Sequence, residues 1–435
     1  MRRRSVIAAG AAALVAGCGV VARPRARATP EQQWARTAWR YLENNTDDDT
    51  GLVGGMDRSP VFTASNAADA LAAIVCAREL DVIDAREFDL RLSRVLGFLG
   101  TMELSNGELP NKAYSARTAK MVSFDGRPAD IGWSALDIGR LLLWLKITGL
   151  RHPHFAEYAD KAVLRWRFCD VIDDCGVLWG SAREAGLLQR YTEGRLGYAQ
   201  VAAAGYAVWG FDARGTLALP ATQVAYVYDR ALRHDARDPR TSGAQAPVLT
   251  LPYVLAGIEL GWALAPLKDL AQTVYEVQEQ RFRREHIFTA RSDYQIAQAP
   301  YTVLDSVYAA GYAFNTIAHD GSHHERLALV NTRAAFGMAA LWPGEYTREL
   351  VAHIAHMYDP DRGWYEGRLE AGGAPQTSIT LATNAVVLET LLFRARGAFY
   401  PPGAQVPGPF QVQTSDPFNR QNRCWPAERA ACRRS

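Results

Sequence analysis

Apolar residues recur every three or four positions through most of the chain. This spacing predicts amphipathic helices, whereas the alternation typical of strands is confined to short pieces such as "CGVLW". The sequence is therefore expected to fold as an all-α protein. The predicted helices cover residues 30–45, 65–80, 85–102, 131–148, 154–171, 196–211, 248–264, 267–284, 302–317, 324–341, 346–358 and 379–396.

One unit recurs along these helices. A helix ends in an acidic turn that contains glycine, a loop with aromatic or polar residues follows, and an apolar helix begins. Two clear copies are "TDDDTGLVGGMDRSPVFTASNAADALAAI" and "YDPDRGWYEGRLEAGGAPQTSITLATNAVVLETLLF", which place Asn66 and Asn384 at a helix start. Such repeats predict an α/α toroid of helical hairpins over residues 31–398, with rim loops that converge on one cleft. Residues 399–435 are expected to form a short, irregular C-terminal tail.

The first residues have the features of an export signal. Three arginines at positions 2–4 precede a short apolar run that ends in "VAGC" at positions 15–18. The run is shorter than the roughly 20 residues that span a bilayer. Its small residues before Cys18 resemble the cleavage site of bacterial lipoproteins, and Arg3-Arg4 resembles a twin-arginine signal. We therefore expect a signal peptide over residues 1–17, a lipidated Cys18 and a tether over residues 18–30.

This interpretation predicts a location in the periplasm or cell envelope, with the lipid as the only membrane anchor. Gly19 is not the aspartate that commonly retains lipoproteins at the inner membrane, which favours the outer membrane. The alternative is an ordinary secreted protein that is cleaved after Ala28.

Net charge bears on the possible partners. Loss of residues 1–17 would remove Arg2, Arg3 and Arg4 and no acidic residue, so the formal net charge would change from +2 to −1. A nearly neutral body does not favour nucleic acid or another strongly charged partner. The expected protein is a monomer that binds a neutral substrate.

The cysteines point to disulfides rather than to a metal. Cys169 and Cys175 are close in sequence, as are Cys424 and Cys432, which predicts two local disulfides in an oxidising compartment. Cys76 lies on an apolar helical stripe and is expected to be a buried free thiol. The spacings are not those of zinc sites, and neither a metal nor a cofactor is expected.

Several runs of the sequence resemble a bacterial family of unknown function, the domain numbered 3131. They are "DTGLV", "GELPNKAYSARTAKM", "DIGWSALDIGRLLLWL", "EGRLGYAQVAAAGYAVWG", "YDPDRGWYEGR" and "TNAVVLETLLF", and the resemblance covers about residues 30–398. Members of that family are exported or membrane-anchored. The family is distantly similar to glucoamylase-like toroids, which include β-1,2-glucan hydrolases and the trimming domain of cyclic glucan synthases. The resemblance implies an (α/α)6 toroid and a glycoside hydrolase, but it does not identify a substrate. We expect the substrate to be a bacterial β-glucan or exopolysaccharide.

Glycoside hydrolysis normally requires two carboxyl groups beside the scissile bond. Glu193 precedes an apolar helix and has tyrosines nearby, so partial burial would raise its pKa and suit a general acid. It could instead interact with the helix dipole or pair with Arg195. Glu108, in the loop "NGELPNKAY", is the first choice for the base. Asp130 is the second choice, although its position before a helix is equally typical of an N-cap.

Other acidic residues are weaker candidates. Asp137 lies three residues before Arg140 on a predicted helix, which favours a structural ion pair. Glu366 and Asp305 occupy corresponding positions in later repeats and are held in reserve as catalytic groups.

Residues in the same loops could bind sugar. Aromatic rings near helix starts could stack on a pyranose, or pack in the core, and polar side chains could bond hydroxyl groups, or cap and bridge helices. The candidates are Asn66, Lys112, Tyr114, Arg117, Trp133, Tyr191, Arg195, Tyr198, Trp364, Glu366 and Asn384.

Two other functions remain open. A polysaccharide lyase on the same toroid would use a Tyr or His base and a cation that neutralises a uronate, and Lys112 and Arg117 could supply that cation. The protein could also be a non-catalytic lipoprotein that binds or assembles glycans.

Overall fold

The computed structural model describes residues 28–400 and 423–433. The predicted signal peptide, the lipidation site at Cys18 and most of the tether lie outside the described residues. Within the described ranges, none of the helices combines the length and apolar character needed to cross a bilayer.

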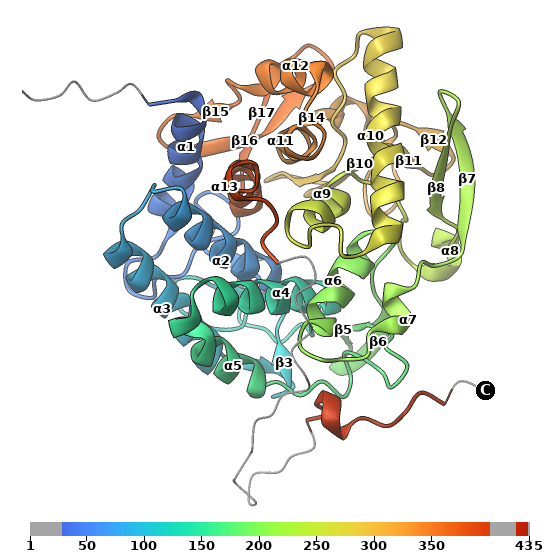
Figure 1. Cartoon of the computed structure of the whole chain (residues 1–435). Coiled ribbons are helices and arrows are strands. Elements are labelled where there is room, and N and C mark those ends of the chain that lie inside the picture. Colours follow the sequence, from blue (N-terminus) through green and yellow to red (C-terminus); the bar gives the residue numbers. More distant parts are fainter. Residues whose placement is uncertain (1–27, 401–422, 434–435) are drawn as a thin grey trace, which may run out of the picture.

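Helices form the main framework (Figure 1). Their bounds are α1 (Pro30–Asn45), α2 (Ala64–Glu79), α3 (Ala85–Thr101), α4 (Ala135–Arg151), α5 (Ala156–Leu164), α6 (Tyr198–Ala207), α7 (Arg214–Leu217), α8 (Pro239–Ser242), α9 (Leu251–Ile258), α10 (Ala265–Glu285), α11 (Thr332–Leu341), α12 (Glu345–Ile354) and α13 (Leu381–Arg396). Short 3₁₀ helices cover Pro153–Phe155, Glu325–Leu327 and Pro426–Glu428.

Six helices contact one another in a closed ring. The contacts run from α2 to α4, α6, α9, α11 and α13, and α13 returns to α2. The helices α1, α3, α5, α10 and α12 pack outside this ring, as the end-on view in Figure 1 shows. The first and last repeats are therefore neighbours in space, as a ring closed through the chain ends requires.

Capping side chains and small residues explain where these helices begin and how closely they pack. The hydroxyls of Thr63, Ser134 and Thr380 accept from the backbone N–H three residues later, which satisfies donors that a helix start leaves free. A Cβ at Gly205 would lie 1.8 Å from the carbonyl oxygen of Gly139, so α4 and α6 meet backbone to backbone. The small residues of the α6 sequence make that approach possible.

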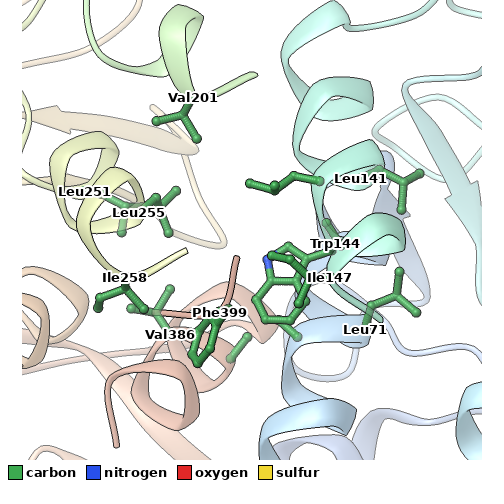
Figure 2. Close-up of a cluster of buried hydrophobic side chains, with 14 of the residues drawn as sticks. Leu71, Leu141, Trp144, Ile147, Val201, Leu251, Leu255, Ile258, Val386 and Phe399 are labelled. Carbon is green, nitrogen blue, oxygen red and sulfur yellow. The ribbon is translucent and has the colours of Figure 1, made fainter. Parts of the chain in front are cut away.

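The interior of the ring is packed with apolar side chains. Figure 2 shows Leu71, Leu141 and Val201 in one buried cluster with side chains of α9 and α13. Trp144 and Phe399 pack with ring centroids 5.4 Å apart. Backbone bonds from Phe399 to Ile258 and from Tyr400 to Glu259 fix the segment that follows α13 against α9.

The expectation of an all-α chain is wrong in one respect, because small antiparallel sheets connect the helices. Two-stranded pairs are β1 (Val61–Thr63) with β4 (Ala113–Ser115), β2 (Leu104–Ser105) with β3 (Leu109–Pro110), β5 (Trp179–Glu184) with β6 (Leu187–Thr192), β7 (Thr222–Val227) with β8 (Arg230–Asp235), and β11 (Tyr308–Ala309) with β12 (Tyr312–Ala313). A three-stranded sheet contains β9 (Asp293–Gln295), β10 (Thr302–Asp305) and β13 (Thr316–Ile317), and a four-stranded sheet contains β14 (Leu329–Asn331), β15 (Tyr358–Asp359), β16 (Gly363–Leu369) and β17 (Pro375–Ile379).

The predicted helix over residues 302–317 is wrong. This segment forms β10 to β13, with Leu304 paired to Ile317 and Tyr308 paired to Ala313. Its sequence, "TVLDSVYAAGYAFNTI", is rich in β-branched and aromatic residues, which favour strands. Apolar spacing over so short a run does not separate the two periods.

The predicted disulfide connectivity is also wrong. Cys169 pairs with Cys424, at a Cα–Cα distance of 5.0 Å, and Cys175 pairs with Cys432, at 4.6 Å. The short C-terminal segment 423–433 lies against loop 169–175, so each cysteine meets one from the other segment. Cys76 is a buried free thiol, as expected.

A buried charge cluster (Asp69, Arg140, Glu259 and Glu389) connects four members of the ring. The guanidinium of Arg140 on α4 bonds Asp69 on α2, Glu259 next to α9 at 3.0 Å and Glu389 on α13 at 3.1 Å. All three carboxylates are almost completely buried. The ion pair expected between Asp137 and Arg140 is replaced by these contacts. One cation faces three acids, so the cluster favours a bound proton.

That proton predicts a pH dependence of stability. Burial, and then the charge of Glu259, raise the pKa of Glu389 well above its ordinary value, although Arg140 opposes the shift. The folded state then binds more protons than the unfolded chain, so the free energy of unfolding should fall as pH rises above the unfolded pKa of about 4.3. Glu389→Gln should remove much of this dependence in thermal denaturation series. If the substitution left the pH dependence of the unfolding free energy unchanged, the assignment of the bound proton to Glu389 would be contradicted.

Candidate active site

Polar side chains gather where the ring helices begin. Ser134 and Asp137 belong to the start of α4, and Tyr198 and Arg333 to the first turns of α6 and α11. The negative charge of Asp69 acts on both Asp137 and Arg333. Side chains that are far apart in sequence therefore share one electrostatic environment at this rim of the ring.

Glu193 lies at the N-terminus of α4, not at that of the helix which follows it in sequence. The Ser134 hydroxyl donates to its Oε1 at 2.8 Å, and the Ala135 N–H donates to its Oε2 at 2.5 Å. Burial raises the pKa of Glu193, and these bonds and the charge of Lys112 oppose the shift. The carboxyl group is thus held rigidly in a site that favours retention of its proton.

Asp137 is a second carboxyl group that lies within the electrostatic influence of Glu193. Burial, and next the negative charge of Glu193, raise the pKa of Asp137 to about 7. The Ser134 hydroxyl interacts with both acids. Because the charge of Glu193 raises the pKa of Asp137, the protonation of Asp137 near neutral pH depends on the state of Glu193. A pair in this state can donate and accept protons.

Lys112 and Tyr191 stand beside this pair. The Lys112 ammonium lies 5.3 Å from the centroid of the Tyr191 ring, and Tyr191 is 38% exposed. Burial lowers the pKa of Lys112, while Glu193 and Asp137 oppose that shift. The site therefore offers a cation and an accessible aromatic ring next to the two acids.

Gly180 on β5 allows Glu193 to occupy its position. A Cβ at this glycine would lie 2.7 Å from Oε2 of Glu193 and 2.9 Å from Cζ of Tyr191. We expect Gly180→Ala to displace the carboxyl group and lower substrate turnover by about 10²-fold, since misplacement of about 1 Å has effects of this size. Gly100→Ala is the control, because a Cβ there meets open space. Normal turnover in Gly180→Ala would exclude this geometric requirement.

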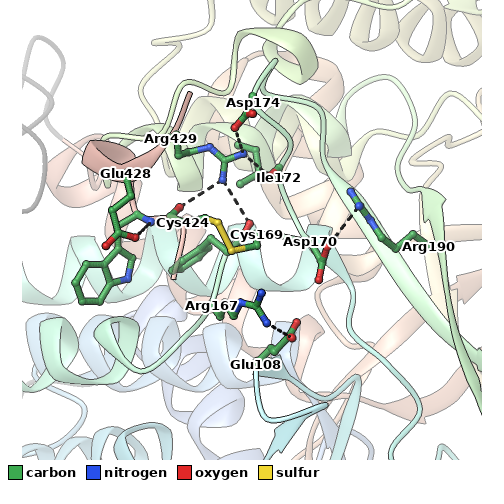
Figure 3. The surroundings of a disulfide bond; sticks show 12 residues. Glu108, Arg167, Cys169, Asp170, Ile172, Asp174, Arg190, Cys424, Glu428 and Arg429 are labelled. Atoms are coloured by element: carbon green, nitrogen blue, oxygen red, sulfur yellow. Dashed lines mark hydrogen bonds and ion pairs between the residues drawn. A yellow bond between two sulfur atoms is a disulfide. The ribbon is translucent and has the colours of Figure 1, made fainter. Parts of the chain in front are cut away.

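Glu108 and Asp130 have other partners. Glu108 pairs with Arg167 at 2.6 Å beside the Cys169–Cys424 disulfide (Figure 3). Asp130 accepts bonds from Ser105 and pairs with Arg183 at 2.6 Å. Burial alone would raise the pKa of Asp130, but its hydrogen bonds lower it. The N-cap of α4 is Ser134, so Asp130 does not cap that helix.

Several expected sugar-binding residues are interior residues. Trp133, Tyr114 and Trp364 are almost completely buried, and their polar atoms bond to backbone oxygens. Rings without exposed faces cannot stack on a sugar, so the stacking role expected of Trp133 and Trp364 is wrong, and the buried Tyr114 likewise offers no surface to a substrate. Asn384 is also fully buried and accepts from the Trp364 N–H at 2.8 Å. Asn66 belongs to the capping box of α2 and donates to Asp69.

The remaining candidates differ in surroundings. Arg195 donates to the carbonyl of Gly194 at 2.6 Å and approaches the carbonyls of Ser242 and Ala244. Tyr198 donates to Asp293 at 2.7 Å. Arg117 is exposed in the loop after β4.

The two reserve acids are completely buried. Thr380 and Thr383 donate to Glu366, and Arg291 and Thr316 bond Asp305. Neither reserve acid offers the exposure that contact with a substrate requires.

Sequence reasoning missed the rim residues Asp69, Asp293 and Arg333 and gave Asp137 a structural role. Sequence position could have identified three of these four residues, because Asp69, Asp137 and Arg333 all fall within the first two turns of ring helices. In the described part of the chain, no three His, Cys, Asp or Glu side chains assemble in a way that could hold a metal ion.

Comparisons with known proteins agree with this framework. Residues 33–397 match the family described as "Protein of unknown function (DUF3131)". No curated protein matches the sequence. A candidate glucoamylase from Bacteroides uniformis superposes with a TM-score of 0.62 at 8% identity, covering 86% of this chain and 94% of that one.

Two glucanases share the fold as well. The endo-β-1,2-glucanase from Chitinophaga pinensis, in complex with sophorotriose and glucose, gives a TM-score of 0.60 at 12% identity, covering 85% and 93% of the two chains. A mutant of the endo-β-1,2-glucanase from Talaromyces funiculosus, in complex with β-1,2-glucan, gives 0.55 at 11% identity and covers 85% of each chain. At these identities the likeness concerns the fold.

Proposed function

This chain belongs to the DUF3131 family of unknown function, and we propose that it is an exported glycoside hydrolase built on an (α/α)6 toroid. The proposal takes the six contacting helices as the inner ring and the rim as the substrate site. Its main support is the Glu193–Asp137 pair, in which two acids share Ser134 and a raised pKa. The glycoside hydrolases among the structural neighbours give independent support.

In the proposed mechanism Glu193 is the general acid. Its proton passes to the glycosidic oxygen as the bond from that oxygen to the anomeric carbon breaks. The charge of Glu193 favours a proton on Asp137, so the reactive form is the one in which this proton lies on Glu193 instead. In that form the ionised Asp137 accepts a proton from the water that attacks the anomeric carbon. Glu193 is assigned the first role because it lies against the exposed ring of Tyr191, where a sugar can stack.

This assignment replaces Glu108 as the base. Glu108 is paired with Arg167, whereas Asp137 shares a hydrogen-bonding group with Glu193. Lys112, at the edge of the pair, is proposed to bond a sugar hydroxyl. The proposed substrates are bacterial β-glucans or exopolysaccharides, and β-1,2-glucan is the first to test because two neighbours act on or bind it.

A panel of polysaccharides tests the reaction class. Purified protein is incubated with β-1,2-glucan, other β-glucans, exopolysaccharides and uronate polymers, and both new reducing ends and unsaturated products are measured. New reducing ends without ultraviolet absorbance are expected. Unsaturated uronate products would instead indicate a lyase. Binding without cleavage of any polymer would indicate a non-catalytic glycan-binding protein.

The proposed location is the cell envelope, with Cys18 as a lipidated first residue. The sequence "VAGC" at positions 15–18 supports this part of the proposal. Mass spectrometry of the mature N-terminus is expected to find a diacylated or triacylated Cys18, and Cys18→Ala should release the protein from membranes. An unmodified N-terminus near Ala28 would contradict it.

A further inference from the structure

We infer that the C-terminal segment 423–432 is a positioning element for Glu193, although it follows the ring in sequence. This inference rests on the proposed role of Glu193. It follows from a continuous series of contacts that begins at the two disulfides, passes through loop 169–175 and ends at strand β5.

The first contacts join the C-terminal segment to the loop. The Cys169–Cys424 and Cys175–Cys432 disulfides fasten both ends of the loop, whose residues lie outside helices and strands. Between them the Arg429 guanidinium donates to the carbonyl of Ile172 at 2.6 Å and approaches the carboxylate of Asp174 at 3.4 Å (Figure 3). A segment 255 residues away in sequence thus adds covalent and polar contacts to a loop that lies outside helices and strands.

The second contacts join this loop to β5. The Trp179 N–H donates to the Val171 carbonyl at 2.8 Å, and its indole donates to the Asp173 carboxylate at 3.2 Å. Arg190, on the paired strand β6, lies 5.0 Å over the Trp179 ring and approaches Asp170 at 3.5 Å. The loop therefore fixes both strands of the β5–β6 hairpin.

The third contacts join β5 to the acid. Gly180, the next residue along β5, faces the Glu193 carboxyl group so closely that no Cβ fits between them. Ser181 accepts from the Trp133 N–H at 3.0 Å and donates its own N–H to the Trp133 carbonyl at 2.9 Å. The residue after Trp133 is Ser134, which donates to Glu193. Both walls around the carboxyl group thus depend on β5.

The chemical consequence is that the disulfides contribute to the burial that raises the pKa of Glu193. Loss of both bonds should loosen the hairpin and allow water to reach the carboxyl group. The acid would then lose its proton at lower pH, and fewer molecules would carry it at neutral pH.

Reduction of the folded protein tests this inference, since a variant without the four cysteines could fail to fold. After full reduction, verified by intact mass, hydrogen exchange in β5 and β6 should rise about tenfold or more, whereas α2 and α13 should stay protected. Unchanged protection of β5 and β6 would overturn the inference. Cys76→Ala with its disulfides intact is the control for effects of the free thiol.

Kinetics supply the second readout. On a cleaved glycan, reduction should lower kcat about tenfold, leave KM within about twofold, and move the basic limb of the pH profile to lower pH. Faster exchange with unchanged kcat would overturn the positioning role. If no glycan is cleaved, the proposed function fails, and the exchange measurement still decides whether the segment fixes the hairpin.

Discussion

Glu193→Gln is expected to lower the turnover of the true substrate by about 10²–10⁴, the usual contribution of a general acid. The fold should remain intact, because the new amide can accept from the Ala135 N–H and donate to the Ser134 hydroxyl. The loss is therefore chemical rather than structural. Steady-state rates, compared with thermal unfolding of the same preparation, measure the two effects separately.

Two matched amides identify the second carboxyl group. Asp137→Asn should also reduce turnover strongly. The pH optimum of the wild type should depend on the titration of Glu193 and Asp137. Glu108→Gln should retain most of the activity, because the carboxylate of Glu108 bonds Arg167 and Asn106 beside the disulfide. A large loss in Glu108→Gln with full activity in Asp137→Asn would reverse the assignment. Ordinary activity in Glu193→Gln would remove the proposed acid altogether.

Arg140→Met is expected to have the largest effect on stability. It removes the cation that faces Asp69, Glu259 and Glu389, all almost completely buried. Breaking a buried pair from one side leaves an uncompensated charge and typically costs about 3–5 kcal/mol. The free energy of unfolding, from denaturant titrations at neutral pH, should fall by an amount of this size.

Acid should partly restore the Arg140→Met variant, because protonated carboxyls no longer need the guanidinium. The difference in unfolding free energy between variant and wild type should therefore shrink as the pH is lowered from neutral. Arg36→Met is a suitable control, as that arginine is exposed on α1. A difference below about 1 kcal/mol at neutral pH would show that the cluster adapts without its cation.

Helix positions were the most predictable part of this fold. The last helix, predicted at 379–396, is observed at Leu381–Arg396, because long periodic segments with a capping residue specify both period and start. The helix predicted over residues 302–317 is wrong because apolar spacing over one short run fits strands and helices alike. The predicted disulfide pairing was wrong for a different reason. The proximity of loop 169–175 to segment 423–433 is set by the tertiary fold.

The candidate site was predictable only where local sequence determines it. Glu193, Lys112 and Tyr191 were singled out from their loops, and the structure brings these three together. Asp137 was judged by its neighbour Arg140 on the same helix, although Arg140 turns to three acids on other helices. Ion pairing across the ring depends on which helices are neighbours in it, and no local sequence pattern predicts these neighbours.

The contact between α2 and α13 has a consequence for the order of events during synthesis. Helices near the two ends of the chain, α2 and α13, must meet before either can bury its apolar face completely. No N-terminal fragment can therefore complete the core. Folding of such a non-local topology is slow, and an incomplete chain exposes surface that favours aggregation. The nascent chain should therefore depend on chaperones until its last helix emerges, and a premature stop before Leu381 should yield an insoluble product rather than a smaller domain.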